Sequence, residues 1–253
     1  MQNIYWLNLA FIASRFYGAM WICPLFDDKM IPKLLKVLLS IIFGLILLPY
    51  IKLNSNGMNL IVVAIFMVQE ILTGLFIGFI FSLPIWLIEN VGNFIDMQRG
   101  EQFGAIINPM TRQQSSSIAK LLSQGFITYL IAMNGLVFFI KIIFGSFKMF
   151  PLNNKIFELG MALFSKAIIF ELIKMFNQYF YWMVILALPV VLLMFLCEFG
   201  VGLFSIFAQQ LNVTILVMPI KSVIAMFVLL IYLGLLYHVT IAKFTANLFS
   251  WVS

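Results

Sequence analysis

Long apolar stretches follow one another along this chain and leave little room for any other kind of segment. They cover residues 4–26, 34–51, 59–88, 118–147, 178–208 and 212–239. Each approaches or exceeds the roughly 20 residues that cross a bilayer as a helix. Only 9% of the residues are charged and the mean hydropathy is +1.10, whereas about a quarter of a soluble domain is charged. The sequence therefore predicts an integral membrane protein or a member of a large apolar assembly.

Prolines interrupt several of these stretches, so kinked or paired half-helices are expected. They are Pro24, Pro49, Pro84, Pro189 and Pro219. Residues 156–176 instead carry spaced lysines and glutamates, a pattern that predicts an amphipathic helix at an interface. When the basic residues are divided over the two sides of a six-span threading, they fall about equally, which gives no orientation. We take this as an indication that not every segment crosses lipid in the ordinary way.

The residue types present favour few kinds of chemistry. The first apolar run carries Arg15 and lacks a basic leader and a small-residue cleavage site, so it does not resemble a signal peptide. Cys23 and Cys197 lie in apolar runs and are predicted to be buried small hydrophobic residues. With one histidine, His238, no His/Cys metal cluster is expected. The net charge of +6 is spread along the chain, so a nucleic-acid partner is not predicted. No glycine-rich loop follows a strand and no nucleophile–base pair is evident, so neither a cofactor nor an enzymatic function is predicted.

The segment 90–120 is the most polar part of the chain. Its charges of both signs cannot face lipid, because unsatisfied polar groups there cost several kcal/mol each. Asp96 and Arg99 are three residues apart and could pair on one helical turn. Gly92, Gly100 and Gly104 suit a constriction built from bent chain, and the serines at 115–117 are expected to cap the next helix. A channel lining, a solvated loop and a subunit contact all remain possible for this segment.

Two apolar stretches carry polar and small residues on one helical face. Glu70, Gly74 and Gly78 recur at intervals of four, which lets another helix backbone approach closely. That helix belongs either to this chain or to another subunit. A proton relay at Glu70 is the weaker alternative because no second titratable group is evident nearby. The second stripe is predicted to pack on a neighbouring subunit and consists of Glu198, Gly202, Ser205 and Gln209, followed by Gln210 and Asn212.

Two motifs resemble one known family. The first is LPIWLIENVGNFIDMQRGEQFG at residues 83–104, followed by Asn108-Pro109 and Gln114-Ser115. The second spans residues 188–222 and contains Ala208-Gln209-Gln210-Leu211-Asn212 and Pro219-Ile220-Lys221. Together they resemble the type III secretion export-apparatus family SctT, called SpaR in injectisomes and FliR in flagella. The form Gln98-Arg99-Gly100 is more similar to the injectisome branch.

The resemblance implies an all-α, membrane-associated fold of kinked helices and helical hairpins packed in a helical export gate. Within a single subunit, residues 1–150 would resemble SctR and residues 151–253 SctS. The protein would form part of the channel wall and closure through which unfolded proteins cross the bacterial inner membrane, with the assembly partly above the bilayer. Its implied partners are SctR-like and SctS-like subunits, an SctU-like switch protein, substrates in transit and membrane lipid.

The candidate residues fall into two expected roles. Those expected to line the channel or gate are Asp96, Gln98, Arg99, Glu101, Gln102 and Asn108. Those expected to pack between subunits are Glu70, Gly74, Gly78, Glu198, Gly202, Ser205, Gln209, Gln210, Asn212 and Lys221. Two other functions stay open from the residues alone: a solitary ion-coupled permease with Glu70 as its ion site, and a membrane-embedded enzyme such as a lipid-modifying transferase.

Overall fold

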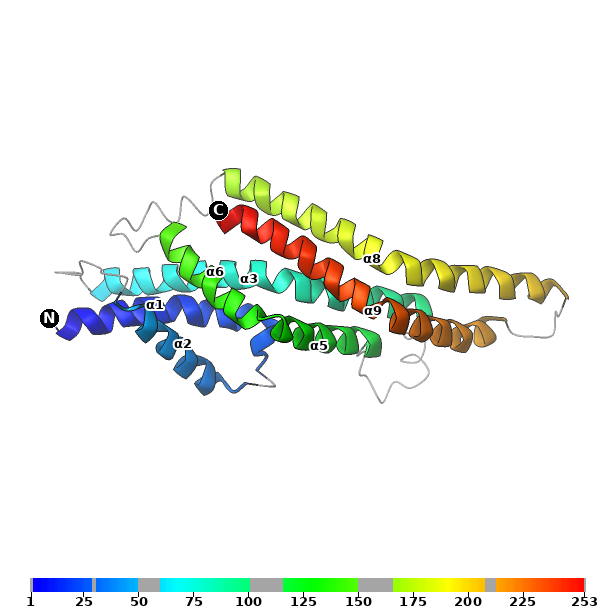
Figure 1. Cartoon of the computed structure of the whole chain (residues 1–253), viewed down its shortest axis with the longest axis horizontal. Coiled ribbons are helices and arrows are strands. Elements are labelled where there is room, and N and C mark those ends of the chain that lie inside the picture. The colour runs from blue at the N-terminus through cyan, green and yellow to red at the C-terminus, as the bar shows by residue number, and fades with distance from the viewer. Residues whose placement is uncertain are drawn as a thin grey trace. The chain divides into compact units, whose positions relative to one another are not determined.

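The computed structural model describes most of the chain, and within the described residues all regular secondary structure is helical. It describes residues 2–28, 31–49, 60–100, 116–149, 166–207 and 213–252. The helices are α1 (Gln2–Ile22), the short 3-10 segment η1 (Pro24–Phe26), α2 (Lys33–Leu47), α3 (Leu60–Arg99), α5 (Ser117–Ala132), α6 (Gly135–Met149), α8 (Lys166–Phe207) and α9 (Val213–Val252) (Figure 1). The predicted all-α fold class is confirmed.

Two boundaries differ from those predicted. Residues 90–99 were expected to begin a polar segment of bent chain, but α3 continues as a helix to Arg99, because Asp96 and Arg99 satisfy each other on one turn. The stretch 118–147 is divided into α5 and α6, which meet at a bend of 75°. Asn134 has φ 59° at this bend, a left-handed conformation that asparagine tolerates better than most residues.

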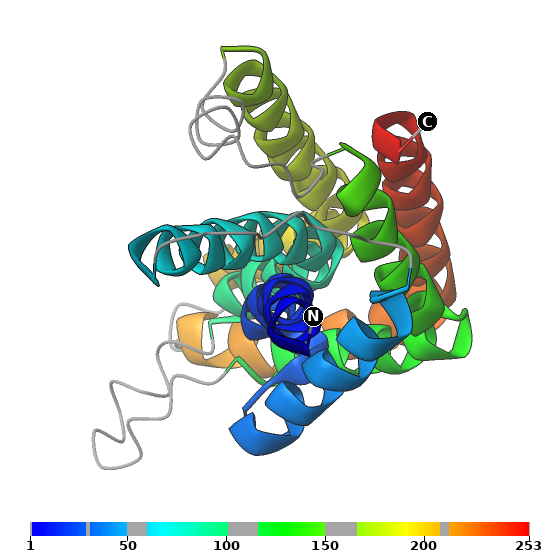
Figure 2. The ribbon, with the colours of Figure 1, turned by 90° about the vertical axis from the view of Figure 1, so that its left-hand side faces the viewer.

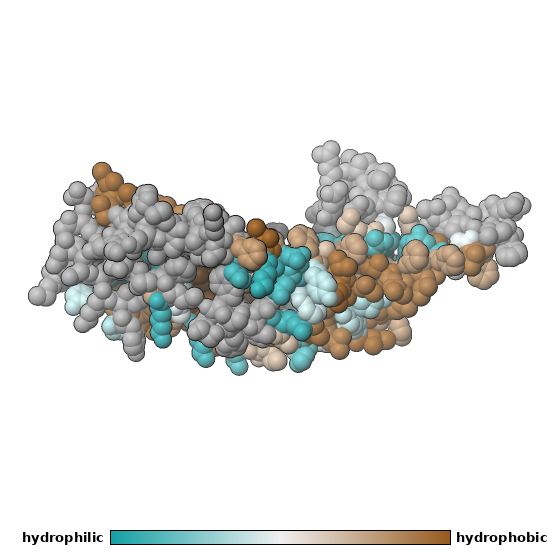
Figure 3. All heavy atoms as spheres, turned by 90° about the horizontal axis from the view of Figure 1, so that it is seen from above, coloured by the Kyte–Doolittle hydropathy of each residue, from teal (hydrophilic) through white to brown (hydrophobic). Residues whose placement is uncertain are grey.

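Three helices are long and apolar enough to cross a membrane, and the bent pair α5–α6 would make a fourth span, among the described residues. The three candidate spans are Ile61–Arg99, Phe170–Phe204 and Val217–Phe244. The structure buries only 22% and 28% of the most apolar windows of the last two. Figure 3 shows one face of the molecule, on which apolar side chains cover much of the described surface. This is the surface of a protein embedded in a membrane.

The chain is made of two compact units that alternate along the sequence. The first comprises Met1–Leu83 and Ile131–Met175, and the second comprises Pro84–Leu130 and Phe176–Trp251. The helix α3 passes from one to the other at Pro84. This grouping by contacts is distinct from the division at residues 150 and 151 that the sequence suggests, which stays a prediction.

In the first unit, α1 packs on the first half of α3 with almost no space between their backbones (Figure 1). A Cβ atom placed on Gly74 would lie 2.0 Å from the carbonyl oxygen of Arg15, and one on Gly78 would lie 2.3 Å from that of Ala19. The predicted small-residue face of α3 is therefore occupied by α1 of the same chain.

The helix α2 of the first unit buries polar side chains and exposes apolar ones. Figure 2 shows it beside α1. Its buried residues are Lys36, Ser40, Gly44 and Leu47. Lys36 donates a hydrogen bond of 2.6 Å to the Asp28 carboxylate, and this bond holds the pKa of that carboxyl below its usual value. Apart from Lys33 in its first turn, its exposed face is aliphatic and consists of Leu34, Leu35, Val37, Leu38, Ile42, Leu45 and Ile46.

The two cysteines lie in different surroundings. Cys23, between α1 and η1, is buried, and its burial raises the pKa of the thiol to about 12. The prediction of a buried residue is confirmed for Cys23. Cys197 is only partly buried, so full burial was wrongly expected there.

In the second unit, the end of α3 packs on α5, and α5 packs on α9. A Cβ atom on Gly92 would lie 2.4 Å from the Cα atom of Ala119. The hydroxyl of Tyr237 on α9 donates a hydrogen bond of 3.0 Å to the carbonyl oxygen of Leu122 on α5. These contacts bring the last turns of α3 to the beginning of α5, where the charged residues of the polar segment lie.

Candidate functional site

A single carboxylate on α3 holds the beginning of α5. The side chain of Asp96 is 3% exposed. Its Oδ2 atom accepts hydrogen bonds from the hydroxyl of Ser116 and from the backbone N–H groups of Ile118 and Ala119, the latter two at 3.0 and 3.4 Å. The first N–H groups of a helix have no partner within it, and a negative charge there is favourable. Asp96 therefore caps α5 from another helix.

Ser116 caps the same helix end in the ordinary way. It precedes α5, and its hydroxyl oxygen accepts a hydrogen bond of 3.3 Å from the N–H of Ala119. The prediction that serines 115–117 provide a cap is confirmed for Ser116. The contribution of Asp96 was not foreseen, because a cap from 20 residues away in the sequence has no local pattern.

Arg99 extends this cluster to α9. Its Nη2 atom lies 2.6 Å from Oδ1 of Asp96, which confirms the predicted pair on one helical turn. Its Nη1 atom donates a hydrogen bond of 3.1 Å to the hydroxyl of Ser222. The preceding residue on α9, Lys221, pairs with Glu198 on α8 at 2.5 Å. Polar contacts thus run from α5 through α3 and α9 to α8, and we call the five residues Asp96, Arg99, Ser116, Lys221 and Ser222 the polar clamp.

The polar clamp lies where the chain leaves α3 and where it enters α5, on either side of residues 101–115. Gly100, with φ 86°, follows the last residue of α3, and Ser116 is bonded to Asp96 one helical turn earlier. The two ends of this segment are therefore held near each other by a buried carboxylate. The segment itself, with Glu101, Gln102 and Asn108, lies outside the described residues.

The other predicted residues fall into three groups. Gln98 is exposed on the last turn of α3. A Cβ atom placed on Gly202 of α8 would meet no atom within 4 Å, so that part of the predicted stripe has open space around it. Ser205 is on α8, but its side chain is outside the described residues, as are Gln209, Gln210 and Asn212 entirely. The assignment of this stripe to a subunit interface stays a prediction.

Glu70 lies in the first unit and has a buried partner there. Nε of Arg15 donates a hydrogen bond of 2.6 Å to Oε2 of Glu70. The same guanidinium donates to the hydroxyl of Ser146 at 3.1 Å and lies 3.9 Å from the centre of the Phe147 ring. The statement that no second titratable group lies near Glu70 was wrong, because Arg15 is distant in sequence and adjacent in space. The pair joins α1, α3 and α6, and a proton relay at Glu70 stays the weaker alternative.

Sequence reasoning assigned no role to Arg15 and Ser222. A signal for Arg15 was present: one basic residue in the first apolar stretch and one acid in the third, each too costly to bury alone. Pairing the two opposite charges would have found the contact. Nothing in the sequence distinguishes Ser222 from other serines.

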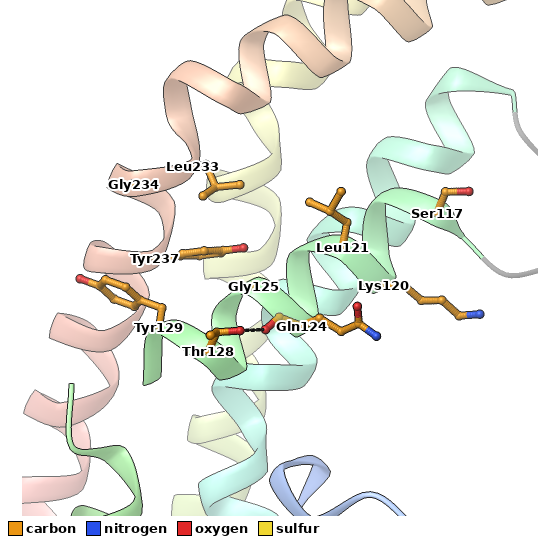
Figure 4. Close-up of a pocket in the computed structure, with 10 residues that line it drawn as sticks. All are labelled: Ser117, Lys120, Leu121, Gln124, Gly125, Thr128, Tyr129, Leu233, Gly234 and Tyr237. Carbon is orange, nitrogen blue, oxygen red and sulfur yellow. Dashed lines mark hydrogen bonds between the residues drawn. The ribbon is translucent and has the colours of Figure 1, made fainter. Parts of the chain in front are cut away.

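A groove of about 750 Å³ lies between α5 and α9 of the second unit. Figure 4 shows Leu233 and Tyr237 reaching from α9 toward α5, while Lys120 and Gln124 extend outward from α5. The remaining lining residues are Ser117, Leu121, Gly125, Thr128, Tyr129 and Gly234. Among the described residues no group of three or more potential metal ligands is found.

Comparison with known proteins links these features to bacterial export. Residues 6–246 match the family described as "Bacterial export proteins, family 1". "Yop proteins translocation protein T" of Yersinia pestis is 33% identical over 184 residues, which cover 73% of this chain and 67% of that protein. "Surface presentation of antigens protein SpaR" of Shigella flexneri is 31% identical over 189 residues, covering 72% and 70%. "Flagellar biosynthetic protein FliR" of Escherichia coli K12 is 23% identical over 250 residues, covering 98% and 91%.

Proposed function

The chain belongs to the bacterial export protein family of SctT, SpaR and FliR, with the injectisome branch favoured, and on that premise we propose that it is a structural subunit of a type III secretion export gate. In this role it forms part of the channel wall and its closure, through which unfolded proteins cross the inner membrane. Its relatives are components of secretion or flagellar export machinery, and the chain itself carries out no catalysis.

The observation that carries the proposal is the length of the apolar helices. The helices α3, α8 and α9 have 40, 42 and 40 residues, which corresponds to about 60 Å each at 1.5 Å per residue. The hydrocarbon core of a bilayer is only about 30 Å thick. Apolar surface beyond that thickness must be covered by protein, which supports a place in an assembly that stands partly above the inner membrane. The SctR-like, SctS-like and SctU-like partners follow from the family.

The closure is assigned to residues 101–115 together with the polar clamp at their base. A closed channel needs a segment that enters the path and an anchor that keeps it there. The clamp supplies such an anchor, because Asp96 and Arg99 connect both ends of the segment to α5 and α9. Gln98, Glu101, Gln102 and Asn108 belong to the proposed lining.

The rival reading, a solitary permease with Glu70 as its ion site, has less support. An ion site needs a carboxylate free to exchange its partner. Glu70 is instead held by Arg15 at 2.6 Å and is 3% exposed. In mild detergent a gate subunit is expected to purify in a large complex with other subunits, whereas a permease would run as a small oligomer.

Replacement of the segment tests the closure. Deleting residues 98–102 would also remove Arg99 and so break the clamp, so a cleaner variant replaces residues 102–114 with a short Gly/Ser linker. We expect assembled complexes that make the inner membrane permeable to small ions. The matched control places the same linker at residues 53–57, the polar segment before α3. Ion-tight membranes with normal secretion from the first variant would exclude a closing role.

A further inference from the structure

The helix α3 leaves the first compact unit at a point where its backbone hydrogen bonding is weakened. The first unit ends at Leu83 and the second begins at Pro84, a proline inside the helix. Proline has no N–H to donate to the carbonyl of Ile80, and its ring pushes that carbonyl aside. Two residues earlier, the hydroxyl of Ser82 donates a hydrogen bond of 2.6 Å to the carbonyl oxygen of Gly78, a bond that often bends a helix. Two bending residues therefore lie within one turn at this boundary.

The chain returns to the first unit at a second break in its helices. The boundary lies between Leu130 and Ile131, next to the bend of 75° between α5 and α6. The bend is closed by a single turn, in which the N–H of Asn134 donates to the carbonyl oxygen of Ile131 at 3.1 Å. Residues 131–134 are all exposed, so side-chain packing does not hold the angle of this turn.

The third crossing lies within α8, between Met175 and Phe176. The first unit receives only the beginning of this helix, from Lys166 onward. Among residues 170–175 no side chain is buried, and Phe170 and Ile173 are 68% and 62% exposed. This crossing therefore adds little that would fix one unit to the other.

The interior of each unit, in contrast, is held by buried polar contacts. In the first unit, Arg15 donates to Glu70 and Ser146. In the second, the Asp96 carboxylate binds Ser116 and Arg99. Packed interiors of this kind change between discrete arrangements and do not deform gradually. Movement is therefore expected at the crossings and not inside the units.

We infer that the chain is hinged at Ser82–Pro84 and at residues 131–134, and that its two units turn about these points during export. A hinge consists of a few residues, often where elements end, that absorb the change in φ and ψ. The polar clamp lies wholly in the second unit, so it moves as one body with its hydrogen bonds intact. The inference rests on the proposed function, because a channel that opens and closes needs a second arrangement of its subunit.

Distances between spin labels test the motion directly. Spin-labelled amino acids are placed at Lys141 in the first unit and Leu203 in the second, and the labelled chain is diluted with unlabelled chain in the co-expressed complex. Lys33 with Lys141 and Gln124 with Leu203 are the control pairs, each within one unit, and all four side chains are exposed. We expect the distance between units to change when an exported chain is trapped in the complex, while both control distances stay the same.

Stiffening α3 provides the second test. Pro84→Ala restores the N–H that bonds to Ile80 and favours a straight helix. We expect normal assembly, no change of the distance between units, and secretion per complex lowered about ten-fold, because hinge substitutions alter turnover. Pro84→Gly leaves the helix easy to bend and should secrete within about two-fold of the unmodified chain. Pro189→Ala is the matched control, because Pro189 interrupts α8 inside the second unit.

Three results would overturn the inference. The first is a distance between units that a trapped chain leaves unchanged, and this measurement decides the matter even if Pro84→Ala does not assemble. The second is normal secretion by Pro84→Ala, and the third is an equal loss in Pro84→Gly, which would assign the effect to packing of the proline ring. If the unmodified chain forms no complex, the proposed function itself fails, whereas a complex with a fixed distance removes only the hinge.

Discussion

At the scale of single residues, the Asp96 carboxylate both caps the beginning of α5 and pairs with a basic side chain. Its carboxylate accepts hydrogen bonds from Ser116 and from the N–H groups of Ile118 and Ala119, and it balances the charge of Arg99. Loss of this one side chain would leave unpaired donors and an unbalanced guanidinium together. The position is therefore more sensitive than an ordinary cap.

We expect Asp96→Ala to loosen the first turn of α5 by about 1–2 kcal/mol, the usual cost of losing a cap. Amide hydrogen exchange in the purified complex should become faster at Ile118 and Ala119. Ser123→Ala is the control, because the hydroxyl of Ser123 only donates to the Lys120 carbonyl within the same exposed turn. Unchanged exchange at both amides in Asp96→Ala would show that the carboxylate does not hold this helix end.

Glu70→Gln separates a packing role from a proton-carrying role. The glutamine oxygen can still accept the hydrogen bond from Arg15, but the buried guanidinium loses its counter-charge, and breaking such a pair fully costs about 3–5 kcal/mol. We expect less assembled complex but normal secretion per complex. Replacing both partners, as Arg15→Met with Glu70→Met, should recover part of the yield. Normal assembly without any export would instead indicate a proton relay.

At the scale of helices, glycines decide where two backbones meet. Gly74 sits against the Arg15 carbonyl, whereas Gly202 has open space around it. The first contact is complete within the chain. The second glycine belongs to a face that α8 leaves uncovered within the described residues.

Substitutions at these two glycines should therefore disrupt different steps, one the folding of the chain and the other its assembly. Gly74→Ala forces α1 away from α3, and overpacking of this kind costs about 1–3 kcal/mol or more, so the chain itself should become sensitive to protease. Gly202→Leu should leave the folding of the chain intact and prevent its assembly with a neighbouring subunit. Protease resistance of the chain and the size of the complex distinguish the two. A complex of normal size carrying Gly202→Leu would contradict the predicted interface.

The helices themselves could be predicted from the sequence, but their limits and contacts could not. Apolar runs identify each helix because the bilayer selects for length and composition. The polar residues 90–99 concealed the continuation of α3, since their charges are satisfied by pairing that hydropathy does not detect. The bend at Asn134 and the pairing of Arg15 with Glu70 depend on backbone conformation and on contacts distant in sequence. The contact between Asp96 and Arg99 was predictable because it is local.

At the scale of the whole molecule, many large apolar side chains of the described residues are exposed. The aliphatic face of α2 and the exposed side chains of α8 and α9, such as Phe204 and Leu230 at 75% and 78% exposure, are examples. Contiguous apolar surface of this kind belongs to an interface with protein or lipid. The stability of the chain is then a property of the assembly and depends on the concentration of its partners.

We expect the chain expressed without other export-apparatus subunits to reach a several-fold lower steady-state amount, because unassembled molecules are removed by proteolysis. Its half-life after translation is blocked, compared with and without co-expressed partners, measures this effect. The control is a membrane protein that is stable by itself, expressed in the same cells. An equal half-life under both conditions would show that the chain is stable without the assembly.

The polar clamp has a consequence for how residues 101–115 can vary. When the two ends of a segment are already held together by the rest of the fold, doubling the number of residues between them costs only about 0.6 kcal/mol in loop-closure entropy. The stability of α3, α5 and α9 should therefore change little when residues are inserted between Gly100 and Ser116. An epitope or a fluorescent domain placed there should leave the helices folded, so any loss of function that follows would come from the segment and not from its anchor.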